Sequence, residues 1–207
     1  MSLRIVYLDE RLIVLDKPSG LLAVPGLGPE NQVNLASQVQ HEYPGSLVVH
    51  RLDRDTSGLI VFARDAETQR HLSRQFHDRL VEKTYCAVVH GCIAGDAGRI
   101  ELPLRRDFQR PPRHRVDLIH GRSAVTEWRV IEQHRDRTRI DLIPLTGRSH
   151  QLRVHTQQLG HAILGDKLYA SAEALAMADR LLLHAARLTL EHPSTGARTE
   201  LAAECTF

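Results

Sequence analysis

The hydrophobic residues of this chain fall into short runs typical of β-strands, with a few helical stretches inserted between them. Runs rich in β-branched residues favour strands, and apolar residues spaced three or four positions apart favour helices. These patterns predict strands at 4–8, 12–15, 59–63, 83–89, 125–131, 139–145, 181–190 and 199–203. They predict helices at 31–43, 66–80, 148–159 and 175–178.

The order of these elements indicates the fold class. Strands follow one another in neighbouring runs instead of alternating regularly with helices, which favours an α+β fold with a mixed, largely antiparallel sheet. A chain of 207 residues with 42% hydrophobic content fits one large domain or two small lobes that share a cleft. Because no repeat, low-complexity tract or linker interrupts it, we expect a single domain spanning residues 1–207.

Composition and missing motifs exclude several classes of protein. No apolar run approaches the length of a membrane span, and residues 1–6 lead directly into a predicted strand, which argues against a signal peptide. The three cysteines form no CxxC pair, so we expect reduced thiols and a cytoplasmic protein. His150 and His155 are five positions apart, not the four of a zinc-binding HExxH motif, and no nucleotide-binding glycine motif is present. We therefore expect neither a metal nor an organic cofactor.

The arginines are unevenly distributed, although the net charge is only +2. Residues 99–122 contain seven arginines against three acidic residues, together with three prolines. The prolines favour an exposed excursion over a core element, and the charge suits a phosphate backbone. The alternative is a general compositional bias, because the whole chain has 24 arginines and 3 lysines. The candidate RNA-binding arginines in this segment are Arg105, Arg106, Arg113 and Arg115.

Two carboxylates, Asp53 and Asp55, lie between arginines just before the apolar run at 59–63. Nearby positive charge keeps a carboxylate ionised and able to act as a nucleophile. An aspartate in a loop is more commonly a turn residue, and Asp65, on the far side of the strand, is an ordinary helix cap. The spacing alone does not choose between Asp53 and Asp55.

Arg148 and Tyr85 are the other candidates. Thr146 is a plausible N-cap, which would put Arg148 in the first helical turn, where the helix dipole disfavours a cation. Such an arginine suggests a carboxylate or phosphate partner, although a solvated arginine is the simpler interpretation. Tyr85 is on a strand, where a tyrosine usually belongs to the core. In a cleft it could stack on a base and handle a proton. His184, in an apolar strand, is expected to be a core histidine.

Several separated segments together resemble the RluA family of pseudouridine synthases, over nearly the whole chain. The matching segments are Leu15-Asp16-Lys17-Pro18-Ser19-Gly20-Leu21-Leu22, His50-Arg51-Leu52-Asp53 with Thr56-Ser57-Gly58-Leu59, Lys83-Thr84-Tyr85, Gly147-Arg148-Ser149-His150-Gln151-Leu152-Arg153-Val154-His155, Leu164-Gly165-Asp166-Lys167-Leu168-Tyr169 and Leu181-Leu182-Leu183-His184-Ala185. The resemblance is strongest to short members that act on 23S ribosomal RNA and transfer RNA. As in those members, we expect no N-terminal S4 domain.

The resemblance implies a role for four residues. Asp53 matches the catalytic aspartate, Arg148 the arginine that pairs with it, and Tyr85 the tyrosine that stacks on uracil and is proposed to act in removing the C5 proton. Arg51 matches the arginine that enters the RNA stack where the target nucleotide leaves it. The implied fold is the pseudouridine synthase fold, a curved mixed sheet in two halves with flanking helices and a central catalytic cleft.

The implied reaction isomerises uridine in structured RNA, including the transfer RNA anticodon stem-loop, without a cofactor. The target nucleotide must be flipped out of its stack. Asp53 then attacks C1′ or removes the 2′ proton, and the sequence leaves both routes open. We expect a monomer that binds RNA and no membrane. The alternatives are a catalytically silent RNA-binding module and a carboxylate-dependent hydrolase, which would need two carboxylates at a set separation.

Overall fold

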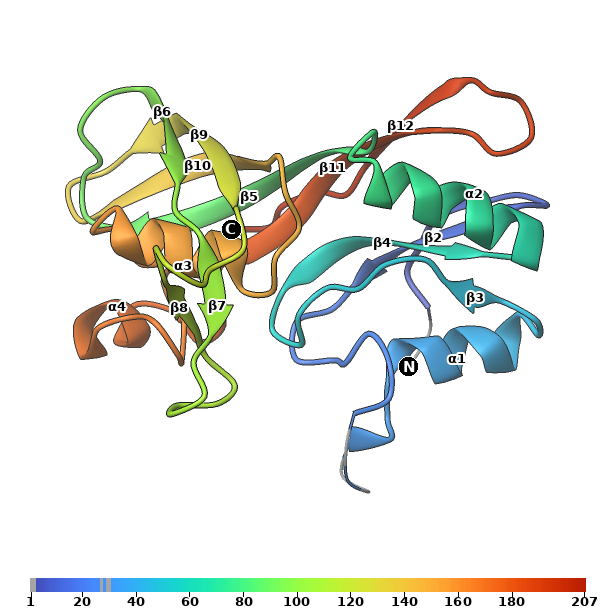
Figure 1. Ribbon diagram of the computed structural model, residues 1–207, viewed down its shortest axis with the longest axis horizontal. Helices are drawn as coiled ribbons and strands as arrows, with labels where there is room; N and C mark the ends of the chain where they lie inside the picture. Colours follow the sequence, from blue (N-terminus) through green and yellow to red (C-terminus); the bar gives the residue numbers. More distant parts are fainter. Residues whose placement is uncertain (1–2, 27, 29–30) are drawn as a thin grey trace. The chain divides into compact units, whose positions relative to one another are not determined.

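The computed structural model describes residues 3–26, 28 and 31–207, and the chain divides into two compact units (Figure 1). The first unit is formed by the residues up to Lys83 together with His184–Thr206. The second is formed by Thr84–Leu183 and Phe207. The first unit is therefore built from both ends of the chain, and the second from its middle.

The sheet of the first unit is centred on β4 (Ser57–Ala63), all seven residues of which are buried. It pairs antiparallel with β2 (Leu12–Lys17) and parallel with β11 (Leu183–Glu191). Three further strands complete this sheet: β1 (Ile5–Leu8) on β2, β12 (Arg198–Ala202) on β11, and the short β3 (Leu47–Val48) on β4. Because β4 is covered on both faces, its apolar run is unbroken.

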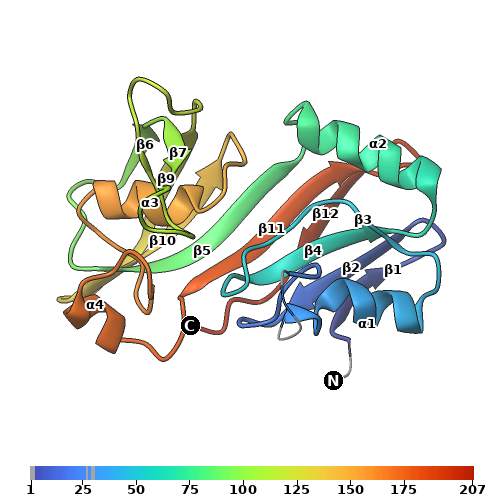
Figure 2. The same cartoon turned by 60° about the horizontal axis from the view of Figure 1, so that its bottom comes forward.

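Two helices cover this sheet, α1 (Leu35–Glu42) and α2 (Ala66–His77), and Figures 1 and 2 show them on opposite sides of it. Asp65 caps α2 as predicted, because its carboxylate accepts a hydrogen bond from the Thr68 amide at 2.8 Å. Leu72 of α2 packs into a core of β2, β4, β11 and β12 side chains. The expected helix at 31–43 begins later, after Asn34, whose side chain accepts from the Ser37 amide.

The parallel contact of β4 and β11 requires a glycine. Gly58 has a φ of +107°, and a Cβ atom there would lie 2.4 Å from the carbonyl oxygen of Ala185, so no other residue fits without moving a strand. Beside it, the imidazole of His184 is 4% exposed, and its Nδ1 lies 2.9 Å from the hydroxyl of Ser57. The prediction of a core histidine is confirmed.

The second unit contains an antiparallel sheet in the order β5, β10, β9, β6 (Figure 2). Its strands are β5 (Glu82–His90), β10 (Arg137–Pro144), β9 (Val125–Gln133) and β6 (Ala97–Glu101). Leu152 of α3 (Gln151–Gln158) packs against core residues of these strands, including Trp128 and Ile140. A short helix, α4 (Ala172–Ala176), matches the helix predicted at 175–178 and begins earlier, because Ser171 caps it.

The arginine-rich segment is exposed over much of its length, as predicted, but it also contains regular strands. It provides β6 and a separate hairpin of β7 (Leu104–Arg106) and β8 (His114–Val116). Leu104 is only 3% exposed and packs with Ala124, Val154 and Tyr169. The prolines that suggested a loop lie outside these strands, where they remove no ladder hydrogen bond.

The α+β class with a mixed, mainly antiparallel sheet is confirmed. The predicted strands are confirmed apart from shifts at their ends. Among residues 3–26, 28 and 31–207, no helix has the length and apolar character to cross a membrane.

Candidate active site

Asp53 lies in the loop between β3 and β4 and is half-buried, as is Asp55. Its backbone carbonyl accepts a hydrogen bond from the Thr56 amide at 3.2 Å, which closes a tight turn. Leu52 is buried and Arg51 is exposed. Burial of Leu52 anchors the loop in the core directly before Asp53. This anchor limits the movement of the aspartate.

A buried lysine anchors the same loop. Lys17, at the end of β2, is fully buried, and its Nζ donates to the carbonyl oxygens of Pro18, Leu21 and Arg54 at 2.9, 2.8 and 2.9 Å. Burial lowers the pKa of Lys17 to about 8, although the charges of Asp55 and Asp53 act in the opposite direction. A second tie joins the Ser19 hydroxyl to the carbonyl of Asp55 at 2.7 Å. The backbone on the C-terminal side of Asp53 is thus fixed to the end of β2.

The residue before Arg51 holds the loop at its other end. Nε2 of His50 accepts a hydrogen bond from the Val61 amide of β4 at 3.0 Å, and the ring stacks on Phe76 with centroids 4.3 Å apart. Burial, followed by the charge of Lys83, lowers the pKa of His50 to about 3. The imidazole is therefore neutral at physiological pH, as its acceptor role requires.

Tyr85 is on β5 in the second unit, opposite Leu142 of β10. Its ring is partly buried and packs against the core of that sheet. The pairing of β5 with β10 fixes its backbone, while its partial exposure leaves part of the side chain accessible.

Arg148 does not lie in the first turn of a helix, so the prediction of Thr146 as the N-cap is wrong. The helix begins at Gln151, and His150 holds the capping position in a left-handed conformation with a φ of 56°. The hydroxyl of Thr146 instead donates to Oε1 of Gln151 at 2.7 Å, and the same oxygen accepts from the Arg148 amide at 3.0 Å. The buried Gln151 side chain thus organises the loop, and the helix-dipole argument does not apply to Arg148.

The Arg148 loop is connected to the arginine-rich hairpin. Nε of Arg148 donates to the carbonyl of Ser123 at 3.0 Å, in the segment that follows β8. The Tyr169 hydroxyl accepts from the His114 amide of β8 at 2.7 Å and lies 2.7 Å from Nδ1 of His150. One hydroxyl therefore joins the hairpin to the residue before α3.

A buried ion pair supports Tyr169. Arg153 donates to both carboxylate oxygens of Asp166 at 2.7 and 2.6 Å, and both side chains are almost completely buried. Asp166 also accepts from the Tyr169 amide at 3.1 Å, and the Arg153 guanidinium lies 5.1 Å from the centre of the tyrosine ring. A bidentate pair with further hydrogen bonds satisfies both buried charges.

The sequence-predicted residues fall into two groups. Arg51 and Asp53 lie in the first unit, and Tyr85, Arg148 and the hairpin arginines lie in the second. Within the hairpin, Arg105 and Arg115 form ion pairs with Asp117 at 3.5 and 3.6 Å, Arg106 is exposed and Arg113 is half-buried. The pairing of Arg148 with Asp53 stays a prediction. The sequence analysis did not identify the roles of Lys17, Gln151 and Tyr169. For Lys17 a signal was available, because a lysine at the end of an apolar strand is unusual in a chain with only 3 lysines.

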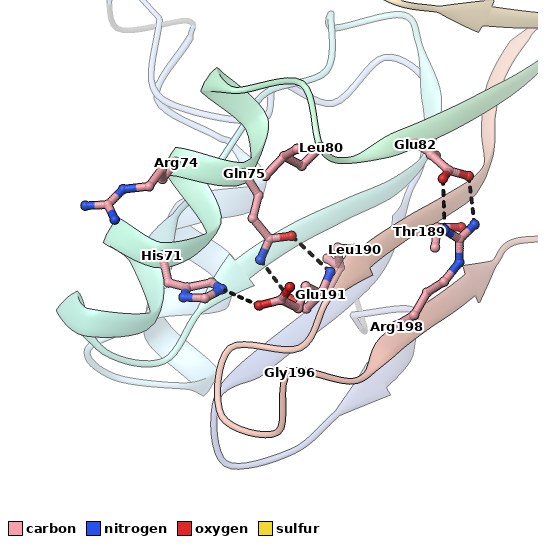
Figure 3. A pocket seen from close by; sticks show the side chains of 10 residues that line it. All are labelled: His71, Arg74, Gln75, Leu80, Glu82, Thr189, Leu190, Glu191, Gly196 and Arg198. Carbon is pink, nitrogen blue, oxygen red and sulfur yellow. Dashed lines mark hydrogen bonds and ion pairs between the residues drawn. The ribbon is translucent and has the colours of Figure 1, made fainter.

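A groove of about 380 Å³ lies elsewhere on the first unit, between the end of α2 and β11–β12 (Figure 3). Arg198 forms two hydrogen bonds with the carboxylate of Glu82 at 3.0 and 2.9 Å, and the Gln75 side chain bonds both backbone groups of Glu191. These side chains use their hydrogen-bonding groups on one another, and none of the predicted site residues lines the groove. In the described part of the chain, no cluster of His, Cys, Asp and Glu could hold a metal ion.

Comparison with known proteins identifies the family. Residues 11–158 match the family described as RNA pseudouridylate synthase. The chain is 48% identical to the dual-specificity RNA pseudouridine synthase RluA of Yersinia pestis, covering 98% of this chain and 99% of that protein. It is also 48% identical to RluA of Escherichia coli strain K12, covering 93% of this chain and 88% of that protein.

A solved structure agrees with the sequence comparisons. The human RNA pseudouridylate synthase domain containing 1 superposes with a TM-score of 0.83 at 27% identity, covering 98% of this chain and 83% of that one. The predicted pseudouridine synthase fold is therefore confirmed. The chain belongs to the RNA pseudouridylate synthase family, within its RluA branch, and is an enzyme that isomerises uridine in RNA.

Proposed function

We propose that Asp53 is the catalytic carboxylate with which this protein rearranges the glycosidic bond of selected uridines in structured RNA. The observation that carries this proposal is the fixation of the Asp53 loop. The fully buried Lys17 binds the carbonyl of Arg54, the residue next to Asp53, at 2.9 Å. Burying a lysine is costly, and here the buried charge holds the backbone beside one particular aspartate. A catalytic group needs such fixed placement.

The two units act as one catalytic domain spanning residues 1–207 in this proposal. Arg148 forms an ion pair with Asp53, which keeps the carboxylate charged and oriented. Tyr85 stacks on the uracil ring and takes part in removing the C5 proton. Its place on β5, paired with β10, with its ring partly exposed, supports a role as a fixed stacking surface.

The chemistry requires no external reactant. The N1–C1′ bond of uridine breaks, a C5–C1′ bond forms, a proton leaves C5 and a proton is taken up at N1, so the composition of the RNA does not change. Asp53 either attacks C1′, giving a covalent sugar–enzyme ester, or removes the 2′ proton, giving a glycal. Either route releases uracil long enough for it to turn and present C5.

The target base has to leave its stack before reaction, at a cost of a few kcal/mol. Arg51, exposed and two residues from Asp53, enters the gap that the nucleotide leaves. Arg105, Arg106, Arg113 and Arg115 bind the RNA backbone from the hairpin, which is held to the Arg148 loop by Tyr169. We expect the protein to act as a monomer in the cytoplasm.

The name of the RluA relatives, dual-specificity RNA pseudouridine synthase, supports two kinds of RNA substrate. We propose uridines in 23S ribosomal RNA and in the transfer RNA anticodon stem-loop. Mapping pseudouridine in RNA from cells with and without this gene identifies the targets. A loss of pseudouridine in only one of the two RNAs would contradict dual specificity.

Replacing Asp53 tests the catalytic assignment. Asp53→Asn keeps the shape of the side chain and removes its charge, so pseudouridine formation is lost while RNA binding stays within a few-fold of the wild type. Asp55→Asn, two residues away in the same loop, is the matched control and retains activity. Unchanged turnover by Asp53→Asn would remove this residue as the catalyst. Mass spectrometry of the RNA separates isomerisation, which preserves mass, from hydrolysis, which releases a base.

A further inference from the structure

The hairpin presents an aromatic side chain to solvent. Phe108 follows β7, and 69% of its surface is exposed. Aromatic residues make up only 4% of this chain, and exposing one gives up the stabilisation that burial of its ring would provide. An exposed ring on a surface rich in arginine therefore points to a ligand.

The turn that carries Phe108 is well ordered. The carboxylate of the neighbouring Asp107 is buried, and it accepts hydrogen bonds from the Gln109 amide at 3.1 Å, the Arg110 amide at 3.3 Å and Nε of Arg110 at 3.1 Å. Burial acts to raise the pKa of Asp107, but the hydrogen bonds from Gln109 and Arg110 lower it overall. The ring is thus held on a fixed turn, which reduces the entropy lost when a ligand binds.

Two guanidinium groups lie close to the ring. The Cζ atom of Arg105 is 5.6 Å from the ring centroid of Phe108, and that of Arg106 is 5.9 Å from it. These distances are within the range of cation–π contacts. An aromatic ring stacks on the face of a nucleobase, and neighbouring arginines bind phosphates, so this combination suits an unpaired nucleotide.

We propose that Phe108 stacks on an unpaired nucleobase of the RNA substrate, at a site separate from the target uridine, while Arg105 and Arg106 bind the adjacent phosphates. The nature of the ligand rests on the proposed function. Leu118 and Ile119 are also exposed, at 77% and 84%, and could suit an apolar protein partner. The seven arginines of residues 99–122 favour a polyanion. Because every base has a π face, Phe108 selects unpaired nucleotides and tolerates different sequences.

The test uses an RNA hairpin with a uridine loop and the same stem with abasic nucleotides in its loop. Phe108→Ala weakens binding of the uridine loop by about 5- to 150-fold, the range that loss of one stacked base produces. It leaves binding of the abasic loop unchanged, and the dependence of affinity on salt is also unchanged, because no charge is removed. Phe108→Trp retains the affinity, whereas Phe108→Leu, which is apolar without a π face, behaves like Phe108→Ala.

The arginines provide the complementary control. Arg105→Gln with Arg106→Gln weakens binding of both RNAs and reduces the salt slope by about 0.7 for each single-stranded phosphate that is no longer neutralised. Equal binding of the uridine loop by the wild type and Phe108→Ala would overturn the proposal, as would equal decreases in affinity for the two RNAs. Formation of pseudouridine by the wild type is measured separately. If the wild type formed no pseudouridine, the proposed function would be refuted, while the result on base stacking by Phe108 would still stand.

Discussion

The Tyr169 hydroxyl lies 2.7 Å from Nδ1 of His150, and the same hydroxyl accepts a hydrogen bond from the His114 amide of β8. His150 holds a left-handed conformation, which is costly for a residue other than glycine. A single hydroxyl thus contacts a strained residue next to the Arg148 loop and also holds the β7–β8 hairpin. The placement of the hairpin and that of Arg148 are coupled through it.

Removing this hydroxyl is expected to loosen the hairpin. Tyr169→Phe removes the hydroxyl that contacts the His114 amide and His150, so the free energy of unfolding falls by about 1–2 kcal/mol. Hydrogen exchange at the His114 amide accelerates, and RNA affinity decreases. Urea denaturation and exchange measurements check these effects. The control is Tyr43→Phe, which removes a hydroxyl from a half-buried tyrosine of the first unit. Wild-type exchange at His114 in Tyr169→Phe would disprove the coupling.

Lys17 is expected to act as a positioning residue for Asp53. Lys17→Met keeps an unbranched side chain of similar length but leaves three carbonyls without a donor, which lowers the free energy of unfolding by about 1–3 kcal/mol. A shift of the Asp53 loop by about 1 Å lowers kcat by about 100-fold, with a smaller effect on KM. Lys167→Met, at an exposed position, is the control. A Lys17→Met protein that is destabilised yet has wild-type kcat would limit Lys17 to a structural role.

The Asp9 carboxylate provides a pH-dependent contribution to stability. It accepts hydrogen bonds from the Tyr7 hydroxyl and from His192 Nε2, both at 2.7 Å, and from the Arg11 and Leu12 amides. Partial burial acts to raise the pKa of Asp9, but these hydrogen bonds, with that from Leu12 the strongest, lower it to about 2. The charged form is thus stabilised in the folded protein.

Because the folded pKa of Asp9 lies below its unfolded value, its contribution is complete above about pH 4 and is lost as the pH falls towards 2. At neutral pH, we expect the free energy of unfolding of Asp9→Asn to be about 1–2 kcal/mol lower than that of the wild type. The difference narrows below about pH 4. Denaturation at a series of pH values checks this, with the exposed Glu10→Gln as control. A difference that stays constant through the acid range would refute the assignment.

Patterns confined to one segment predicted much of the fold. The strand β4 has an unbroken apolar run, and α2 has its Asp65 cap and apolar residues on one face, so both were found from sequence. The hairpin β7–β8 was missed, because each of its strands has only three residues. Arginines and nearby prolines hid Leu104 and Val116, which pack into the core.

The candidate site was harder to predict than the fold. The sequence pointed to Asp53 and Arg148 through local motifs, but the groups that hold them are distant in sequence. Lys17 reaches a carbonyl 37 residues away, and Tyr169 bonds an amide 55 residues away. The error over Thr146 arose in the same way, because its hydroxyl bonds a side chain, that of Gln151, instead of a backbone amide of the helix. No spacing rule describes such contacts.

The close approach of Gly58 and Ala185 has a consequence for the order in which the protein folds during synthesis. The first unit cannot complete its sheet until β11 has left the ribosome, because β11 supplies the neighbour of β4. The second unit is continuous from Thr84 to Leu183 apart from Phe207, so nearly all of it is translated before that point. Nascent chains that end before residue 184 would therefore contain nearly the whole central unit, with the Asp53 loop on a sheet that still lacks β11 and β12.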